Sequence, residues 1–196
     1  MFTGIIRHLG FLAGYQRNRQ VMLIEAPDLP GPLAKGESLA VNGVCLSVEA
    51  HERTKLTFHL SAETLERSNL GHLQPKAILN LELPLTLQTP LSGHILTGHV
   101  DGLGTVLRVE RRGPGKRLSL SFPPELQPFL VPKGSIGLNG VSLTIASLSS
   151  KTFEVELIPL TLEKTNLGYL RPGDKVNLEG DIIGKYVYNY LSKKNT

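Results

Sequence analysis

Short runs of alternating apolar and polar residues extend along most of the chain, and glycine, proline, asparagine and serine separate them. The runs that favour strands are 38–48, 55–61, 77–83, 118–122, 136–145 and 153–158. Strand-like runs with turn residues about every 8 to 12 positions are typical of β-sandwiches and β-barrels. The pattern therefore predicts an all-β protein.

A different pattern begins near the C-terminus and predicts a helix. Between Asp181 and Lys194 the apolar residues recur at helical spacing and form one stripe, consisting of Ile182, Ile183, Tyr186, Val187, Tyr190 and Leu191. The stripe could pack on the barrel that precedes it or contact another copy of the chain, and the pattern favours neither. Asp181 is suited to cap the N-terminus of this helix.

The chain contains one sequence twice. Segment 42–48, Asn-Gly-Val-Cys-Leu-Ser-Val, returns as Asn-Gly-Val-Ser-Leu-Thr-Ile at 139–145, and 61–71 returns at 158–168, each 97 positions later. Thr3-Gly4 returns as Thr97-Gly98 at a slightly shorter offset. A unit of roughly one hundred residues can bury its own core. The chain is therefore predicted to consist of two copies of one domain with two similar pockets.

Each copy has the same predicted turn and short helix. Asn42-Gly43 and Asn139-Gly140 are tight-turn dipeptides, because asparagine and glycine tolerate positive φ. Segments 63–69 and 161–166 predict one or two helical turns, closed by a glycine suited to the left-handed conformation at a helix end. We expect each half to be a small Greek-key barrel with a short helix.

Composition indicates an ordinary globular protein. The chain has 196 residues, of which 40% are hydrophobic and 19% charged, and a net charge of +4. The basic residues are scattered, and the cluster at 111–117 surrounds Gly113-Pro114-Gly115, so solvated turn charges are the favoured interpretation and nucleic-acid binding is not expected. No run approaches the roughly 18 apolar residues of a membrane span. A single cysteine and the lack of a leader pattern predict a cytoplasmic location.

The chemistry must come from scattered side chains, because the sequence has no fingerprint for a nucleotide cofactor, a nucleophile elbow or a zinc site. Cys45 and Ser142 share one repeat position, where each is either a packed small residue or a ligand contact. His94 and His99 lie with Asp101 in the glycine-rich junction between the copies, where structural and functional roles are equally supported.

Lysine-glycine pairs precede the turn strands in both copies. Lys35-Gly36 is followed by Ser38, and Lys133-Gly134 by Ser135. Solvated lysines are the simplest interpretation, and a ligand contact is the alternative.

Four segments taken together resemble the riboflavin synthase family across the whole chain. They are 1–6 (Met-Phe-Thr-Gly-Ile-Ile), 42–48, the junction 92–102 and the closing segment 177–186. The resemblance implies two six-stranded Greek-key barrels, at 1–93 and 94–180, and a C-terminal helix with its tail at 181–196 that assembles a homotrimer.

The resemblance also implies an activity. The family dismutates two molecules of 6,7-dimethyl-8-ribityllumazine without an external cofactor or metal, as the last step of riboflavin biosynthesis. One molecule donates a four-carbon unit to the other, which gives riboflavin and 5-amino-6-ribitylamino-uracil. One substrate would lie on the N-terminal barrel and one on the C-terminal barrel of a neighbouring subunit. The family further implies association with lumazine synthase.

By the same resemblance His99 is the candidate for proton transfer, and Ser142, Cys45 and Asp181 would complete the catalytic set. Side chains or backbone groups of both copies, including the segments 2–6 and 98–100, would bind the substrates. They are Phe2, Thr3, Gly4, Ile5, Ile6, Ser38, Cys45, Leu46, Ser47, His59, Leu60, Ser61, Ala62, Glu63, Thr64, Gly98, His99, Val100, Lys133, Val141, Ser142, Leu143, Thr144, Glu156, Leu157, Ile158, Pro159, Leu160 and Thr161.

One position departs from the family pattern. The second helix segment commonly reads Pro-Glu-Thr-Leu, and here Leu160 replaces the glutamate, whereas the first copy keeps Glu63-Thr64. Two alternatives to an enzyme are a lumazine- or flavin-binding antenna protein on the same scaffold and a flavin-binding barrel of the reductase type. The retained Cys45, His94, His99, Ser142 and Asp181 favour the enzyme over the antenna. The reductase type lacks support because its Arg-x-Tyr-Ser signature is absent.

Overall fold

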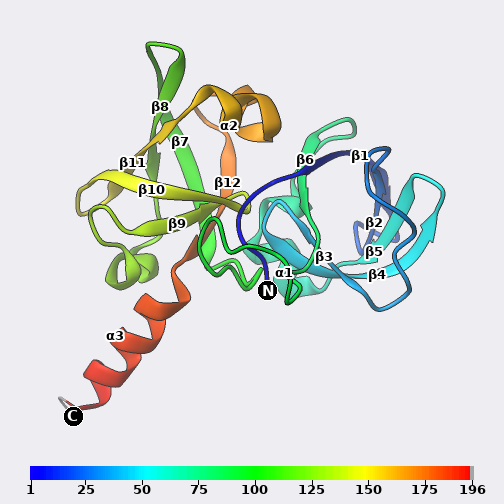
Figure 1. Cartoon of the computed structure of the whole chain (residues 1–196), viewed down its shortest axis with the longest axis horizontal. Helices are drawn as coiled ribbons and strands as arrows, with labels where there is room; N and C mark the ends of the chain where they lie inside the picture. The colour runs from blue at the N-terminus through cyan, green and yellow to red at the C-terminus, as the bar shows by residue number, and fades with distance from the viewer. Residues whose placement is uncertain (195–196) are drawn as a thin grey trace.

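The computed structural model describes residues 1–194 and contains two closed six-stranded antiparallel barrels and a projecting helix (Figure 1). The first barrel, in the order β1-β2-β5-β4-β3-β6, consists of β1 (His8–Gln16), β2 (Val21–Glu25), β3 (Ser38–Val41), β4 (Val44–Glu52), β5 (Lys55–His59) and β6 (Ile78–Glu82). The second, in the order β10-β11-β8-β7-β12-β9, consists of β7 (Gly102–Arg112), β8 (Gly115–Ser121), β9 (Ser135–Leu138), β10 (Val141–Leu148), β11 (Thr152–Leu157) and β12 (Lys175–Gly180). The prediction of two six-stranded barrels is confirmed, while the predicted boundary at 93/94 stays a prediction.

The two barrels share strand register as well as strand order. Cys45 pairs with Ala40 in the first barrel, and Ser142 pairs with Gly137 in the second. A bulge interrupts β4 between Val48 and Ala50, and another interrupts β10 at the positions 97 residues later. Because a bulge bends its strand and increases its twist, matching bulges give both barrels the same curvature.

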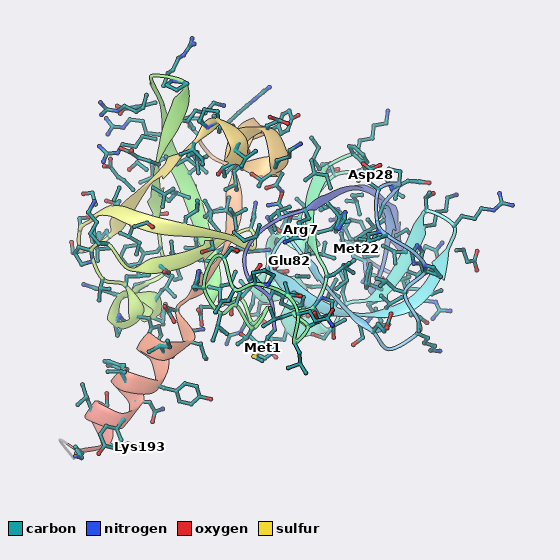
Figure 2. All side chains as sticks on the ribbon, viewed as in Figure 1. Met1, Arg7, Met22, Asp28, Glu82 and Lys193 are labelled. Carbon is teal, nitrogen blue, oxygen red and sulfur yellow. The ribbon has the colours of Figure 1, made fainter. Side chains whose placement is uncertain are left out.

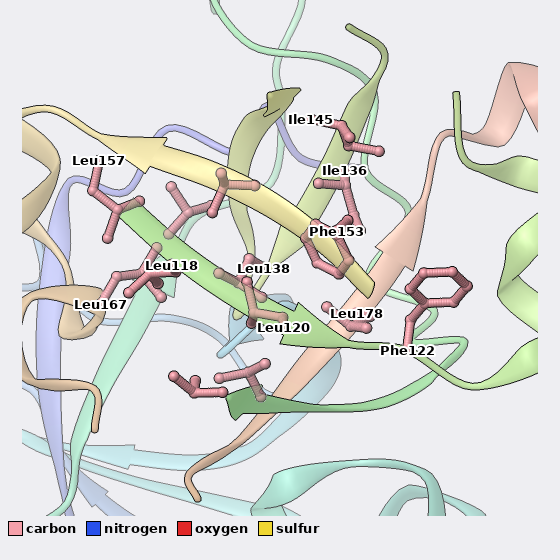
Figure 3. Packing of buried hydrophobic residues seen from close by; sticks show 14 of the residues in the cluster. Leu118, Leu120, Phe122, Ile136, Leu138, Ile145, Phe153, Leu157, Leu167 and Leu178 are labelled. Carbon is pink, nitrogen blue, oxygen red and sulfur yellow. The ribbon is translucent and has the colours of Figure 1, made fainter. Parts of the chain in front are cut away.

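Each barrel encloses its own apolar core. Leu118, Leu120, Leu138 and Phe153 are fully buried in the second barrel (Figure 3), as Met22, Ile24, Leu56 and Phe58 are in the first. Alternate residues of each strand face inward, which is why these positions recur with a period of two. Each fully buried side chain of this size contributes about 1.5–3 kcal/mol to the free energy of folding. Because both barrels bury several of them, each copy is stabilised by a core of its own.

The predicted turns and short helices are present, but the role predicted for the closing glycines is wrong. Asn42 and Gly43 have φ of 47° and 78°, and their counterparts at 139 and 140 have 46° and 78°. Helices α1 (Ala62–Arg67) and α2 (Pro159–Lys164) each lead into a 3₁₀ turn, at Asn69–Gly71 and Asn166–Tyr169.

Gly71 and Gly168, which close the predicted helical segments, are not among the positive-φ residues. A Cβ at either position would lie 2.8 Å and 2.3 Å, respectively, from the carbonyl oxygens of Leu65 and Leu162. These glycines are therefore required for close packing against the preceding helix.

Buried asparagines join the barrels across a local two-fold axis. Nδ2 of Asn80 donates to the carbonyl of Asn139 at 2.9 Å, and Nδ2 of Asn177 donates to the carbonyl of Asn42 at 2.8 Å. The amide of Asn166 donates to Oδ1 of Asn80, and that of Asn69 to Oδ1 of Asn177, each at 2.7 Å. Because these bonds are reciprocal, the duplicated residues fix the orientation of one barrel on the other.

Helix α3 (Ile182–Lys194) extends away from both barrels (Figure 1). Its inner contact is with the 3₁₀ segment Pro124–Phe129, where Tyr188 meets Phe129 edge to face at 5.6 Å between ring centroids. Tyr186 is 74% exposed, and no residue of the helix is buried. Among residues 1–194, no helix is long and apolar enough to cross a membrane.

Candidate functional site

Two extended segments cross between the barrels, and each is held by a buried glutamate. Oε1 of Glu82 accepts from the amide and the hydroxyl of Thr3, both at 2.7 Å. Oε1 of Glu179 accepts from the amide of Thr97 at 2.7 Å and from its hydroxyl at 2.6 Å. Figure 2 shows Glu82 near the N-terminal segment, between Met1 and Arg7. Segments 1–6 and 95–100 are therefore equivalent parts of the two copies.

Burial changes the acidity of both glutamates. It raises the pKa of Glu82 above its ordinary value, and hydrogen bonds from Thr3 and Gly4 offset part of this increase. Burial likewise raises the pKa of Glu179, against hydrogen bonds from Thr97 and the charge of Lys185. These carboxyls are structural anchors, since their oxygens are occupied by the crossing segments.

Each crossing segment also contacts the opposite barrel at the predicted reactive residue. The amide of Ser142 donates to the carbonyl of Gly4 at 2.8 Å, and the amide of Cys45 donates to the carbonyl of Gly98 at 2.9 Å. A Cβ on Gly4 would lie 2.5 Å from Cβ of Ser142, and one on Gly98 would lie equally close to Cβ of Cys45. The glycines permit this approach, which brings each crossing segment against the equivalent residues Ser142 and Cys45.

The N-terminal cavity, of about 320 Å³, lies where the junction crosses β4 and α1. It is lined by Val44, Cys45, Glu63, Thr64, Arg67, Ser68, Gly98, His99 and Val100. Arg67 and Glu63 form an ion pair at 3.3 Å, so the charges on α1 compensate each other. The half-buried thiol of Cys45 and the exposed imidazole of His99 are the reactive groups here.

The C-terminal cavity, of about 410 Å³, overlaps the corresponding place on the second barrel, because Ser142 and Thr161 correspond to Cys45 and Thr64. It is lined by Arg117, Lys133, Ser142, Leu143, Thr144, Ala146, Glu156, Ile158 and Thr161. Both linings contain hydroxyls and one carboxylate, but the C-terminal cavity has two cations, Arg117 and Lys133, and the N-terminal cavity has a thiol and an imidazole. The duplication has therefore produced two cavities with different chemistry.

The two junction histidines serve opposite barrels. His94 is buried, and its Nδ1 lies 2.7 Å from Oγ of Ser142. Burial lowers the pKa of His94, against the charge of Asp181, so this imidazole is neutral at pH 7 and can accept a proton. His99 lines the N-terminal cavity with Cys45. One short segment thus places a base beside each cavity.

Asp181 lies at the start of α3 and is not among the residues that line either cavity. Its Oδ1 accepts from the amide of Ile183 at 2.9 Å, as expected of a helix cap. Asp101 instead accepts from Nζ of Lys185 at 2.6 Å and from the amide of Gly180 at 2.8 Å. These bonds fix the base of α3 on the junction.

The remaining predicted binding residues fall into three groups. Leu46, Leu60 and Leu157 are buried in the cores, so only their backbone groups could meet a ligand. Phe2 packs on Leu96 in a small cluster between the barrels. The others are not among the residues that line the two cavities, and are Gly4, Ile5, Ile6, Ser38, Ser47, His59, Ser61, Ala62, Val141, Pro159 and Leu160. Of these, Ile6 and Val141 belong to the buried core.

Two interpretations of the basic residues were wrong. The amide of Gly36 donates to Val48, and that of Lys133 to Ile145, so Lys133 corresponds to Gly36 and not to Lys35. Lys133 has a φ of 65° where the first copy has glycine, and its side chain lines the cavity.

The turn cluster is the second correction. Gly113 and Pro114 form the hairpin turn as predicted, but Nζ of Lys116 donates to the carbonyl of Gly168 at 2.7 Å. Arg117 lines the C-terminal cavity. Arg117 is the third residue of β8, and a strand beginning directly after a two-residue turn would have indicated that its side chain is not part of the turn. The neighbouring basic residues led to the interpretation as a turn charge.

Comparison with known proteins agrees with this duplication. A family model described as the lumazine binding domain matches residues 3–84 and 97–181. A riboflavin synthase of Actinobacillus pleuropneumoniae is 36% identical over 99% of this chain and 91% of its own length. That of Mycobacterium tuberculosis is 39% identical over 95% of this chain and 96% of its own.

The fold is also similar to solved structures. The crystal structure of LumP complexed with riboflavin superposes with a TM-score of 0.82 at 24% identity, covering 92% of this chain and 99% of that one. LumP complexed with 6,7-dimethyl-8-(1'-D-ribityl) lumazine gives a TM-score of 0.79. At this identity the similarity establishes the shared two-barrel fold.

Proposed function

Because the chain belongs to the riboflavin synthase family, we propose that it dismutates two molecules of 6,7-dimethyl-8-ribityllumazine into riboflavin and 5-amino-6-ribitylamino-uracil. The observation that carries this proposal is the pair of cavities built around the equivalent residues Cys45 and Ser142, each with its own nearby histidine. A reaction between two copies of one substrate needs two related binding places. Holding both substrates in one orientation removes much of the entropic barrier of a bimolecular step.

The reaction requires a proton to leave the 7-methyl group of one substrate. In the C-terminal cavity the hydroxyl of Ser142 can take that proton while passing its own to Nδ1 of His94. In the N-terminal cavity His99 can transfer protons, and the Cys45 thiol is the nucleophile available to the adjacent ring carbon. No external cofactor enters this scheme.

The other predicted residues have supporting roles in this proposal. Lys133 supplies positive charge, and Thr144 and Thr161 supply hydroxyls to the substrate in the C-terminal cavity. In the N-terminal cavity Thr64 supplies a hydroxyl, and Glu63 supplies a carboxylate that can accept hydrogen bonds. Asp181 acts through its charge on His94 and its cap on α3 and makes no direct substrate contact in this scheme.

We further propose that α3 assembles a homotrimer. Five apolar side chains on its surface are more than half exposed, namely Ile183, Tyr186, Val187, Tyr190 and Leu191. We propose that in this trimer the N-terminal cavity of one protomer faces the C-terminal cavity of its neighbour, as the family resemblance implies. A cytoplasmic location is supported by the single cysteine. Association with lumazine synthase stays a prediction.

The direct test mixes the purified protein with 6,7-dimethyl-8-ribityllumazine alone and follows riboflavin formation and lumazine consumption. Two lumazines consumed per riboflavin formed is the expected result. Ligand binding measured by equilibrium dialysis, together with no conversion, would contradict the enzyme and indicate an antenna protein. Ser142→Ala and His99→Ala are expected to retain the fold and lose turnover by about 10²-fold or more.

A further inference from the structure

The C-terminal cavity contains an arginine that has no counterpart in the first barrel. Arg117 on β8 pairs in register with Glu156 on β11. At the equivalent place in the first barrel, Val21 on β2 pairs with His59 on β5. Since His59 and Glu156 are 97 positions apart, the two copies differ here at a matched pair of positions.

Two carboxylates position this guanidinium. Nε of Arg117 lies 3.5 Å from Glu154, and Nη2 lies 3.4 Å from Glu156. The Arg117 side chain is 25% exposed, and its Nε is buried without a hydrogen bond of good geometry. Within residues 1–194, Nη1 has no partner. The guanidinium is thus held on one edge and is available on the other.

A second cation lies in the same cavity. Lys133 forms no ion pair with any described residue, and its backbone has the left-handed φ that glycine has in the first copy. In the N-terminal cavity Arg67 is paired with Glu63 at 3.3 Å. The C-terminal cavity has two cations, of which Arg117 is paired with carboxylates and Lys133 is not, so the unpaired positive charge lies in the C-terminal cavity.

We propose that Arg117 stabilises the anionic form of the substrate bound in the C-terminal cavity, so that the molecule which loses its 7-methyl proton is the one bound there. This inference rests on the proposed function. A C–H bond of the methyl group breaks, and the proton passes to Oγ of Ser142 as the Ser142 proton moves to Nδ1 of His94. The electron pair spreads through the ring to the pyrimidinedione oxygens, where Arg117 and Lys133 can donate hydrogen bonds.

The test measures carbanion formation apart from turnover. The protein and 6,7-dimethyl-8-ribityllumazine are mixed in D₂O, and NMR follows the replacement of 7-methyl protons by deuterium above the protein-free rate. Riboflavin formation is followed in the same sample, and ligand binding by equilibrium dialysis. Arg117→Gln is expected to slow the enzyme-dependent exchange about tenfold, and Arg117→Lys to restore most of it.

Matched variants make the outcome decisive. Arg112→Gln, on the same hairpin and exposed beside Glu110, is expected to exchange at the wild-type rate. Unchanged exchange in Arg117→Gln, with ligand binding retained, overturns the inference and leaves the proposed function intact. A larger loss in Arg67→Gln than in Arg117→Gln overturns it too, because the anion would then form in the N-terminal cavity. Ligand binding without exchange or riboflavin in the wild type refutes the proposed function itself.

Discussion

Gly43 and Gly140 meet backbone to backbone where the two barrels join. A Cβ on Gly43 would lie 2.6 Å from the amide nitrogen of Gly140, and a Cβ on Gly140 would lie 2.7 Å from that of Gly43. Both glycines have a φ of 78°. The duplicated Asn-Gly turns therefore serve both as hairpin turns and as the contact at the local two-fold axis.

Gly43→Ala is expected to lower the free energy of unfolding by about 2–4 kcal/mol. Part of the loss is the strain of an alanine at positive φ, and the rest is the separation of the barrels. Gly31→Ala is the control, because Gly31 has a φ of 67° but no atom within 4 Å of its Cβ position. Urea unfolding should show that this control lowers the free energy of unfolding by about 1 kcal/mol. Equal losses in the two variants would show that the contact between the turns carries no stability.

Asn80→Ala is expected to destabilise the protein by about 2–4 kcal/mol, because it removes a buried side chain with three hydrogen bonds to the other barrel. The amide of Asn166 and the carbonyl of Asn139 would lose partners together. Thermal unfolding checks this, with the exposed Asn189→Ala as control. A loss below about 0.5 kcal/mol would contradict a role for the asparagines in joining the barrels.

Much of the architecture could be predicted because duplication makes each copy evidence for the other. Asn42-Gly43 and Asn139-Gly140 indicated the same turn twice, and the turns have the expected φ. The pairing of Asn80 with Asn166 could not be predicted, since it depends on how two finished barrels approach each other. Lys133 was misaligned by one residue because sequence matching favoured Lys-Gly over backbone register.

The candidate site was predictable only in part. Cys45, Ser142 and His99 were expected from the sequence, and the structure places them at the two cavities. Arg117 was not expected, because its neighbours in sequence are turn charges and only strand pairing turns it toward the cavity. His94 lies beside Ser142 and His99 lines the N-terminal cavity because of the path of the junction between the barrels. The five-residue spacing of the two histidines does not determine that path.

His94 should make the wild type lose stability in acid. Burial lowers its pKa below the ordinary value of 6.5, so the unfolded chain takes up the proton more readily. Its contribution to stability is complete above that value and is lost as the pH falls through the folded-state pKa. Urea unfolding between pH 7.5 and about pH 5 should therefore show a larger decrease for the wild type than for His94→Gln.

The comparison isolates His94 because the other perturbed groups are the same in both proteins. The pKa values of Glu82 and Glu179 are raised by burial, so their contributions are lost as the pH rises and not as it falls. Identical pH dependence in the wild type and His94→Gln would contradict a buried neutral imidazole beside Ser142.

Leu160→Glu is expected to stabilise the protein by about 0.3–1 kcal/mol. Leu160 is 59% exposed in the first turn of α2, where a carboxylate interacts favourably with the helix dipole and can pair with Lys164. The first copy has this arrangement in Glu63 and Arg67. Leu160→Gln is the size-matched control without charge. Equal stabilities of the two variants in urea would show that the electrostatic contribution is absent.

Charged residues on the apolar face of α3 should separate the protomers. Val187→Glu combined with Leu191→Glu changes two side chains that are 52% and 54% exposed, so each barrel should keep its unfolding temperature. In an assembly both introduced carboxylates would be buried without partners. Their desolvation would weaken the association of the protomers by several kcal/mol for each interface. Sedimentation equilibrium should show the mass decreasing from three chains to one, while Ser150→Glu, on the exposed turn between β10 and β11, retains three. A wild type that sediments as a single chain would refute assembly through α3, and with it the pairing of cavities from neighbouring protomers.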